Sequence, residues 1–210
     1  MVRDLLILGT GPHSAEMAEI VARVNRTQPT WNLLGSVSAS GAGVGEVRNG
    51  YTVLGSLEQV ARHPTACLVP DNEWPHPLEI PRDRLVSLVD PSAFVSRTAS
   101  IGLGCVIYPH CFIGLHARLG DFVFCLSGCV INHDDVLEDG VVLASNVSLA
   151  GGVHVEVGCY LGQGCAIREN LRIGRGSLIG MGAVVTKDVP PKSVMAGNPA
   201  KKLRDRSAHA

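Results

Sequence analysis

From Val95 to Val185 the chain carries an aliphatic residue, or at one position a cysteine, at every sixth position, and the frame never slips. A period of six fits neither the period of about 3.6 of a helix nor the simple alternation of a strand. It is typical of a parallel β-helix, in which short strands are joined by tight turns and three repeats close one triangular coil. The repeat positions are Val95, Ile101, Ile107, Ile113, Leu119, Cys125, Ile131, Leu137, Leu143, Leu149, Val155, Leu161, Ile167, Ile173, Ile179 and Val185.

The first 85 or so residues lack this repeat. They contain short apolar runs, segments with apolar residues at helical spacing, and glycine-rich turns. We expect an α/β, Rossmann-like βαβ domain over residues 1–88 and a left-handed parallel β-helix of hexapeptide repeats over residues 89–210. The segments 38–50 and 70–81 are predicted to be loops. The expected elements of the first domain are strands at 5–8, 33–37 and 66–69 and helices at 14–26 and 57–62.

Composition narrows the possible partners. The formal net charge is −1, which gives no basic field for nucleic acid or an anionic membrane. No apolar run approaches the roughly 18 residues of a membrane-spanning helix, and Leu5–Leu8 lacks the flanks of a signal peptide. We therefore expect a cytoplasmic protein without a nucleic-acid or membrane partner.

The seven cysteines predict neither disulfides nor a metal centre. Five of them occupy the small inward slot of a repeat, four residues after an aliphatic position, and Cys125 replaces an aliphatic residue. They are interpreted as small buried hydrophobes in a reducing compartment. The sequence contains no Cys-x-x-Cys pair, so no zinc site is predicted.

Several motifs outside the repeats complete a pattern. They are Gly9-x-Gly11-x-His13 near the start, Asp90-Pro91-Ser92-Ala93 before the first coil, and Lys187–Pro190 followed by Gly197-Asn198-Pro199-Ala200-Lys201 at the end. Over nearly its whole length the chain resembles the NeuD/PglD-type hexapeptide acetyltransferases. That resemblance implies acetyl-CoA as co-substrate and a sialic acid or a nucleotide-linked amino sugar as acceptor.

The same resemblance assigns site residues. Ile131-Asn132-His133-Asp134 is similar to the catalytic segment of the family, which makes His133 the general base and Asp134 the carboxylate that orients it. Gly151 lies one coil further on and is expected to hold the thioester carbonyl through its amide. The other implied residues are Gly162, Gly180, Met181, Asn198, Pro199 and Lys201 for acetyl-CoA, and Gly9, Gly11, Pro12, His13 and Ser14 for the acceptor, with no metal.

The chemistry of acetyl transfer suits these residue types. The thiolate of a thioester leaves readily, but an acceptor amine is mostly protonated at neutral pH. An imidazole, with an ordinary pKa of about 6.5, can take the proton, and a carboxylate can fix its tautomer. A backbone N–H aimed at the developing oxyanion contributes about 3 kcal/mol. Glycine lets the thioester approach the backbone closely.

Some residues leave alternatives open. His110 and His116 lie six residues apart and are interpreted as surface residues or as minor participants in the site. Asp135 falls in an inward slot, where it either reaches solvent through a bent turn or hydrogen-bonds within the His133 cluster. Gly9–His13 is either a phosphate-binding turn before a helix or a plain turn. The tail residues Lys201, Lys202, Arg204 and Arg206 are either solvated or bind a phosphate.

The acceptor side departs from the family pattern. The acidic pair that usually follows the second strand is missing after Gly35, and a proline-rich loop with Trp74 as a possible stacking platform replaces a helix. The Rossmann glycine spacing is incomplete, so NAD is not predicted.

We predict transfer of acetyl to the amino group of a UDP- or dTDP-linked amino sugar by a homotrimer with His133 at a cleft between subunits. The alternatives are O-acetylation of a sialic acid or related sugar, a β-helical carbonic anhydrase and a non-catalytic scaffold. The anhydrase would need a His-x4-His pair, which the sequence lacks.

Overall fold

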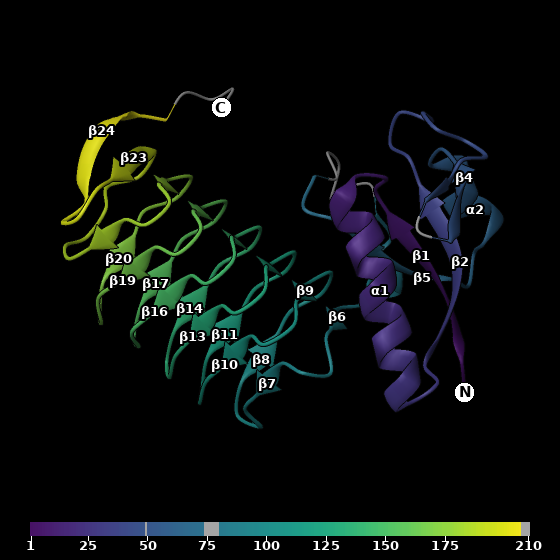
Figure 1. Cartoon of the computed structure of the whole chain (residues 1–210), viewed down its shortest axis with the longest axis horizontal. Helices are drawn as coiled ribbons and strands as arrows, with labels where there is room; N and C mark the ends of the chain where they lie inside the picture. Colours follow the sequence, from purple (N-terminus) through teal and green to yellow (C-terminus); the bar gives the residue numbers. More distant parts are fainter. Residues whose placement is uncertain (49, 74–79, 207–210) are drawn as a thin grey trace. The chain divides into compact units, whose positions relative to one another are not determined.

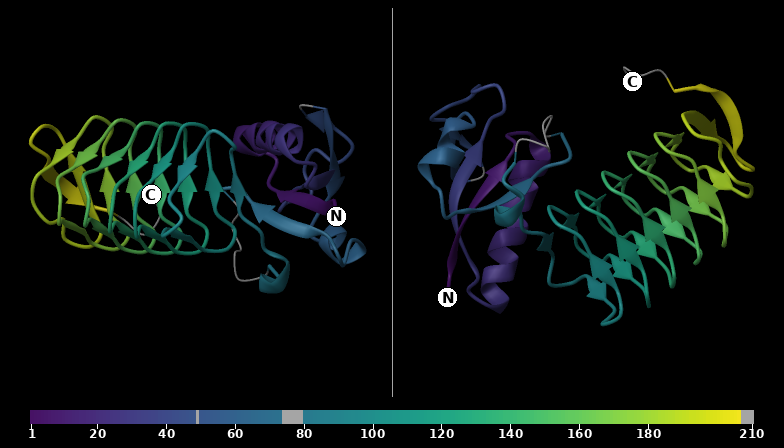
Figure 2. Two further views of the ribbon diagram at one scale, coloured as in Figure 1. Left: turned by 90° about the horizontal axis from the view of Figure 1, so that it is seen from below. Right: turned by 180° about the vertical axis from the view of Figure 1, so that it is seen from behind.

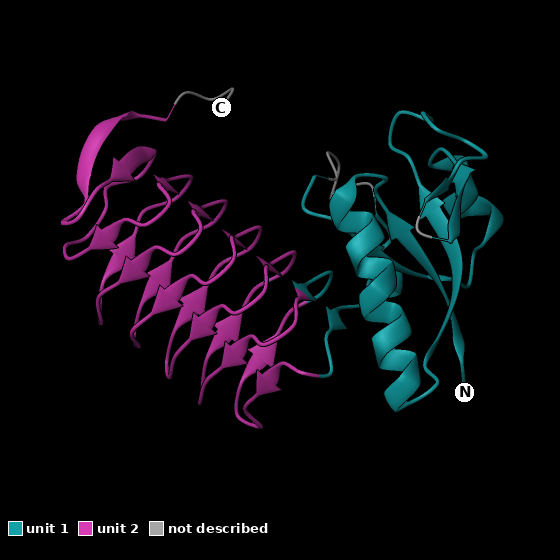
Figure 3. Cartoon of the chain, in the orientation of Figure 1, with its two compact units in different colours: residues 1–91, 103–106 teal, residues 92–102, 107–210 magenta. Residues whose placement is uncertain are grey.

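A computed structural model describes residues 1–48, 50–73 and 80–206. The chain divides into two compact units, drawn in different colours in Figure 3. Unit 1 comprises residues 1–91 and 103–106, and unit 2 comprises residues 92–102 and 107–210. Within the described residues no helix is long and apolar enough to cross a membrane.

Unit 1 is built on a parallel βαβ start. The apolar run Leu5–Leu8 is almost completely buried and pairs in parallel with β2 on one side and β5 on the other. Helix α1 connects β1 to β2 and buries Met17, Ile20 and Val21, which lie at helical spacing. The elements are β1 (Arg3–Leu8), α1 (Pro12–Thr27), β2 (Trp31–Val37), β3 (Val47–Arg48), β4 (Tyr51–Gly55), α2 (Glu58–Arg62), β5 (Cys67–Pro70), the 3-10 helix Arg82–Arg84 and β6 (Leu88–Val89).

The sheet of unit 1 differs from the sequence prediction in one part. Its strand order is β3-β4-β2-β1-β5, and β3 pairs with β4 in antiparallel fashion, so the sheet is mixed. The prediction of a plain loop over residues 38–50 was therefore wrong at Val47–Arg48, and β4 was missed. The described part of unit 1 contains two α-helices, so the structure confirms the parallel βαβ unit rather than a complete Rossmann-like domain.

Unit 2 is a parallel β-solenoid of the left-handed type, whose stacked coils are visible in Figures 1 and 2. Its strands form three sheets, in which neighbours come from successive coils. The first sheet contains β7 (Phe94–Val95), β10 (Phe112–Ile113), β13 (Val130–Ile131), β16 (Ser148–Leu149), β19 (Ala166–Ile167) and β22 (Val184–Val185). The second contains β8 (Ser100–Ile101), β11 (Arg118–Leu119), β14 (Val136–Leu137), β17 (His154–Val155) and β20 (Arg172–Ile173). The third contains β9 (Val106–Ile107), β12 (Phe124–Cys125), β15 (Val142–Leu143), β18 (Tyr160–Leu161), β21 (Leu178–Ile179), β23 (Ser193–Ala196) and β24 (Lys201–Asp205).

The register of the solenoid confirms the six-residue repeat. Ile113 pairs with Ile131, which pairs with Leu149, so equivalent residues stack directly from coil to coil. All three side chains are fully buried. Because the strands are only two residues long, the period of six puts one aliphatic residue of each strand inside and leaves the turns to carry polar side chains.

The cysteines belong to the core, as the sequence predicted. All seven are free and buried. Burial raises the pKa of Cys159 to about 11 and that of Cys165 to about 12, so neither is a thiolate near neutral pH. Cys159 and Cys165 therefore fill space in the core rather than act as nucleophiles.

The C-terminal end is more ordered than the sequence suggests. Strand β23 continues the third sheet, pairing in parallel with β21 at Val194 and Met195. The basic segment that begins at Lys201 then folds back as β24, antiparallel to β23. The residues of β24 are exposed, in agreement with a solvated tail, but the strand itself was not expected.

Candidate active site

His133 and Asp134 form a close pair on the turn after β13. The His133 Nδ1 atom lies 2.9 Å from Asp134 Oδ2, and both side chains are exposed by about three fifths (66% and 61%). A carboxylate only accepts hydrogen bonds, so Nδ1 carries the proton and the Nε2 lone pair of a neutral ring is free to accept another. Asp134 adopts a left-handed φ of 61°. This backbone turn directs both side chains out of the coil.

Gly151 occupies the position of His133 in the following coil. A Cβ atom at Gly151 would lie 3.0 Å from His133 Nε2 and 3.1 Å from Cε1, and the φ of this residue is +108°. The imidazole therefore lies against a backbone that has no side chain. The two turns are also bonded, because the amide of Gly152 donates to the His133 carbonyl at 3.0 Å. The base and the glycine named from the sequence are thus adjacent.

Asp135 is fully buried directly beside this pair. Its Oδ2 accepts the amide of Asn132 at 2.7 Å, and its Oδ1 accepts the amide of Val153 at 2.8 Å. Burial raises the pKa of this carboxyl to about 6, against the opposing effect of the two amides. The alternative in which Asp135 reaches solvent is wrong. The carboxylate instead links the backbone of the His133 turn to that of the Gly151 turn.

The other two histidines considered from the sequence lie at different places: His116 is on the turn one coil earlier, where Leu115 O accepts the Asp134 amide at 2.9 Å, and His110 is on another corner of the solenoid. His110 and His116 are exposed turn residues with left-handed φ values of 63° and 59°. Their amides donate to Ser92 Oγ and Thr98 Oγ1, respectively. Both residues therefore have a structural place in the turns, where their amides bond to the preceding coil.

The residues expected to bind acetyl-CoA lie in the last coils. Gly162 and Gly180 are close approaches between coils: a Cβ at Gly162 would lie 2.6 Å from Ile179 O, and one at Gly180 would lie 3.2 Å from Ala196 Cβ. Met181 follows Gly180 with its side chain 79% exposed. Asn198 and Pro199 form the connection from β23 to β24, and Lys201 begins β24. The structure gathers these residues at one end of the solenoid, where Gly162 lies against the backbone of Gly180 and Met181.

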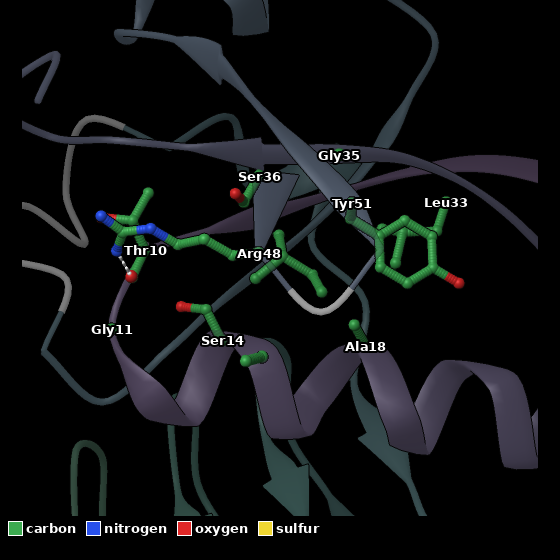
Figure 4. A pocket seen from close by; sticks show the side chains of 11 residues that line it. Thr10, Gly11, Ser14, Ala18, Leu33, Gly35, Ser36, Arg48 and Tyr51 are labelled. Atoms are coloured by element: carbon green, nitrogen blue, oxygen red, sulfur yellow. Dashed lines mark hydrogen bonds between the residues drawn. The ribbon is translucent and has the colours of Figure 1, made fainter. Parts of the chain in front are cut away.

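The predicted acceptor residues begin helix α1 of unit 1. Gly11 precedes the helix and Pro12 is its first residue, while His13 Nδ1 lies 3.2 Å from Glu16. A pocket lies beside this turn, as Figure 4 shows. Its wall includes three residues that the sequence analysis did not single out, Ser36, Arg48 and Tyr51, and Arg48 donates a hydrogen bond to the Thr10 carbonyl.

Two carboxylates line the other side of the Gly9–Gly11 turn. Ser14 donates to Asp71 Oδ2 at 2.6 Å, and a Cβ at Gly11 would lie 3.1 Å from Glu73 Oε2. Burial is the main cause that raises the pKa of Asp71. Sequence reasoning missed Asp71, although it directly follows a buried parallel strand, where ligand-binding residues gather. Trp74, the candidate stacking residue, falls outside the described residues.

Metal-ligating side chains do not gather in the described ranges of the chain. No group of three or more His, Cys, Asp or Glu residues there could hold a metal ion. The His133–Asp134 pair at the candidate site is suited to holding and moving a proton.

Comparisons with known proteins point to one kind of enzyme. No family model and no curated protein matches the sequence. Among solved structures, a histidine-to-alanine variant of GDP-perosamine N-acetyltransferase from Caulobacter crescentus, in complex with CoA and GDP-perosamine, has a TM-score of 0.85 at 26% identity, covering 98% of this chain and 99% of that one. The acetyltransferase domain of PglB from Neisseria gonorrhoeae, in complex with acetyl coenzyme A, has a TM-score of 0.83 at 26% identity, over 97% and 100% of the two chains. WeeI from Acinetobacter baumannii shares the fold at 24% identity, with a TM-score of 0.82 over 96% and 100%.

The full-length coverage matters because both units are matched, not the solenoid alone. Together with the motifs at the two ends of the chain, these neighbours confirm the resemblance seen in the sequence. Over both units the chain is similar to acetyl-CoA-dependent sugar acetyltransferases with a β-solenoid, in agreement with the resemblance to NeuD/PglD-type enzymes.

Proposed function

We propose that the protein transfers acetyl from acetyl-CoA to the amino group of a nucleotide-linked amino sugar, with His133 as general base. The observation that carries this proposal is the contact of the His133 imidazole with the bare backbone of Gly151, while Asp134 holds the opposite ring nitrogen. The neighbour crystallised with CoA and GDP-perosamine supports the N-acetyl assignment and the use of a nucleotide-linked sugar.

The reaction follows from the free nitrogen of the ring. The neutral acceptor amine attacks the thioester carbonyl carbon, and His133 Nε2 takes a proton from the amine nitrogen as the new C–N bond forms. The C–S bond then breaks, and the CoA thiolate leaves and takes up a proton from the imidazolium. Asp134 stabilises the imidazolium, and the Gly151 amide donates to the oxygen that becomes negative during attack.

The co-substrate is assigned to the end of the solenoid that carries Met181 and the Asn198–Lys201 segment. Met181 offers an exposed, flexible apolar side chain for the pantetheine arm, and the basic side chains of β24 suit its phosphates. Gly162 and Gly180 keep the coils close together next to this face.

Unit 1 is assigned to the acceptor, as a Rossmann-like module that holds the nucleotide in the pocket beside α1. The pocket combines apolar walls with Ser14, Ser36, Arg48 and Tyr51, which offer hydroxyls, a cation and an aromatic ring. Carboxylates at Asp71 and Glu73 suit hydroxyl or ring N–H donors better than a bare phosphate on their side of the turn. The nucleotide is therefore expected to place its phosphates toward Arg48.

The test is a screen of acetyl-CoA consumption. Purified protein is mixed with acetyl-CoA and with amino sugars linked to UDP, dTDP or GDP, and with free sialic acid, and released CoA thiol is measured. Turnover with at least one nucleotide-linked amino sugar, lost in His133→Ala, supports the proposal. Turnover with sialic acid alone would favour O-acetylation, and unchanged turnover in His133→Ala would remove the assigned base.

We also propose a homotrimer, because one sheet of the solenoid exposes aromatic rings. Phe94 and Phe112, on β7 and β10, stack with ring centroids 5.0 Å apart while 56% and 39% exposed. An exposed apolar face of this kind is typical of an interface between subunits. Light scattering should give three times the chain mass of 22.1 kDa, and the mass of a single chain would contradict this assembly.

A further inference from the structure

In the coils over residues 95–180 the amide directly after each aliphatic repeat residue donates to a backbone carbonyl of the next coil, except at Asn132, next to His133. At equivalent positions in other coils the amide donates to the next coil: Gly114 to Ile131 O at 2.8 Å and Ala150 to Ile167 O at 3.1 Å. By this pattern the amide of Asn132 would donate to Leu149 O. The Asn132 amide donates to Asp135 Oδ2 instead. The side-chain Nδ2 of Asn132 donates to Leu149 O at 2.7 Å.

The turn that carries Gly151 shows a matching change. In several turns the amide after the turn donates back to the carbonyl three residues earlier, as Ala117 does to Gly114 O and Ala183 to Gly180 O. Val153 holds the same place after Gly151 and Gly152, and its amide donates to Asp135 Oδ1. Gly151 has a φ of +108°, whereas Leu115, His133 and Met181, in the same slot of other turns, have no positive φ. One carboxylate thus accepts an amide from each turn, and at Asn132 it takes the place of a coil-to-coil backbone bond.

Winding of the coil does not require this carboxylate. The same inward slot holds Ala117 one coil earlier and Val153 one coil later, and all three residues are fully buried. Burying a carboxylate is unfavourable, and it is tolerated only with strong hydrogen bonds. An acid that the fold does not need, placed between the base and the glycine, requires another explanation.

We infer that Asp135, together with Asn132, is a clamp that sets the spacing of the His133 turn against the Gly151 turn, and that Asp135 is a positioning residue for the acetyl transfer. The inference rests on the proposed function for its effect on turnover, but the clamp itself is a property of the resting protein. Asp135 bonds to backbone on both sides of the gap, so it holds the imidazole and the oxyanion-binding amide in one geometry. A shift of about 1 Å between such groups is enough to reduce turnover a hundredfold.

The experiment compares Asp135→Ala with a matched control, Asp139→Ala. Asp139 Oδ1 accepts the amide of Asp121 at 2.8 Å, so it also joins neighbouring coils, but on a different turn. Both variants lose one carboxylate that binds backbone amides. Asp135→Asn serves as a second variant that keeps the size of the side chain but can accept only one of the two amide hydrogens.

Hydrogen exchange read by mass spectrometry reports the clamp without any substrate. In Asp135→Ala we expect exchange to accelerate about tenfold or more in peptides that contain Asn132 and Val153, because each loses a charge-assisted bond. In Asp139→Ala the acceleration should appear at Asp121 and not at these two sites. Unchanged exchange at Asn132 and Val153 in both Asp135 variants would overturn the clamp.

Turnover then tests the positioning role. We expect kcat of Asp135→Ala to fall by about ten- to a hundredfold while KM for acetyl-CoA changes less than about twofold, with a smaller fall for Asp135→Asn. Asp139→Ala should keep both constants. Altered exchange with unchanged kcat would overturn the positioning role. If the wild-type protein turned over no acceptor, the proposed function would fail, and the exchange result would still decide the clamp.

Discussion

The turns at Gly114–Ala117 and Asn132–Asp135 stand one coil apart at the same corner of the solenoid, yet they are held together by different chemistry. The earlier turn uses none of its own side chains: Gly114 donates to Ile131 O of the next coil, and Ala117 donates back to Gly114 O. The later turn depends on two side chains, the carboxylate of Asp135 and the amide of Asn132. A backbone-closed turn tolerates any small residue, whereas a side-chain-closed turn does not.

This difference indicates where a functional site can form within a regular repeat. A regular coil satisfies its own polar groups and offers a fixed, featureless surface. Function requires a place where the backbone departs from the repeat, and the released N–H groups must then find new acceptors. In this chain the departure coincides with the one turn pair that brings an imidazole against a bare glycine. The following predictions test that contrast.

The largest effect is expected for the base itself. Replacement of His133 by Ala should lower kcat for acetyl transfer by about a thousandfold, within the range for loss of a general base. His110→Asn is the matched control, since His110 is an exposed turn residue with a left-handed φ that asparagine also tolerates. The comparison uses steady-state release of CoA thiol. A similar fall in both variants would mean that the solenoid, not the imidazole, had been damaged.

A methyl group at Gly151 should act on the same pair from the other side. The added Cβ would meet the imidazole at 3.0 Å, at a φ of +108° that alanine rarely adopts. We expect Gly151→Ala to reduce kcat by roughly a hundredfold through displacement of the ring. Gly140→Ala is the control, because a Cβ at that left-handed turn glycine meets nothing within 4 Å. Equal activity of the two variants would separate Gly151 from the site.

The contrast also explains what could be read from the sequence. The solenoid was predictable because the same pattern recurs every six residues: one aliphatic side chain points into the core, and a turn follows it. Even Cys125, which breaks the aliphatic series, kept the frame and is fully buried. His133 and Gly151 were identified together because they lie one coil apart, and stacking of coils converts that separation into contact.

Prediction was weaker where no repeat constrains the chain. The antiparallel pair β3 and β4 was missed because β3 is only two residues long and lies in a glycine-rich stretch, where no alternation can be seen. The partners of Asp135 were also out of reach. A buried acid could be recognised as unusual from its slot, but its acceptor role depends on two amides freed by local backbone changes at Asn132 and Gly151, which no pattern of residue types records.

The orienting carboxylate should matter less than the base. Asp134→Asn keeps the hydrogen-bonding shape but removes the charge that stabilises the imidazolium. Because both side chains of the pair are mostly exposed, solvent screens their interaction, and we expect kcat to fall only about thirtyfold. Steady-state release of CoA thiol measures this fall. A kcat equal to that of the wild-type protein would show that Asp134 does not act on the base.

The smallest effect is a change of stability with pH at Asp135. Burial raises the pKa of its carboxyl to about 6, and the charges of His133 and Asp134 act on it in opposite directions. Between about pH 4 and pH 6 the folded chain therefore binds a proton that the unfolded chain has released, so this group favours folding more as the pH falls. From pH 7.5 to pH 5 the wild-type protein should gain roughly 1 kcal/mol of unfolding free energy relative to Asp135→Ala.

The measurement is the urea midpoint of both proteins at the two pH values and at one protein concentration, because an oligomer's stability depends on concentration. The unfolding free energy of Asp139→Ala should change by the same amount as that of the wild-type protein, since Asp139 is exposed on its turn and Asp135 is intact in this variant. A constant difference between the wild-type protein and Asp135→Ala at pH 5 and pH 7.5 would mean that the carboxyl titrates in the ordinary range. In that case Asp135 would hold the two turns without the free-energy cost that burial of its charge implies. The altered turn would then differ from its regular neighbour only in its hydrogen bonds.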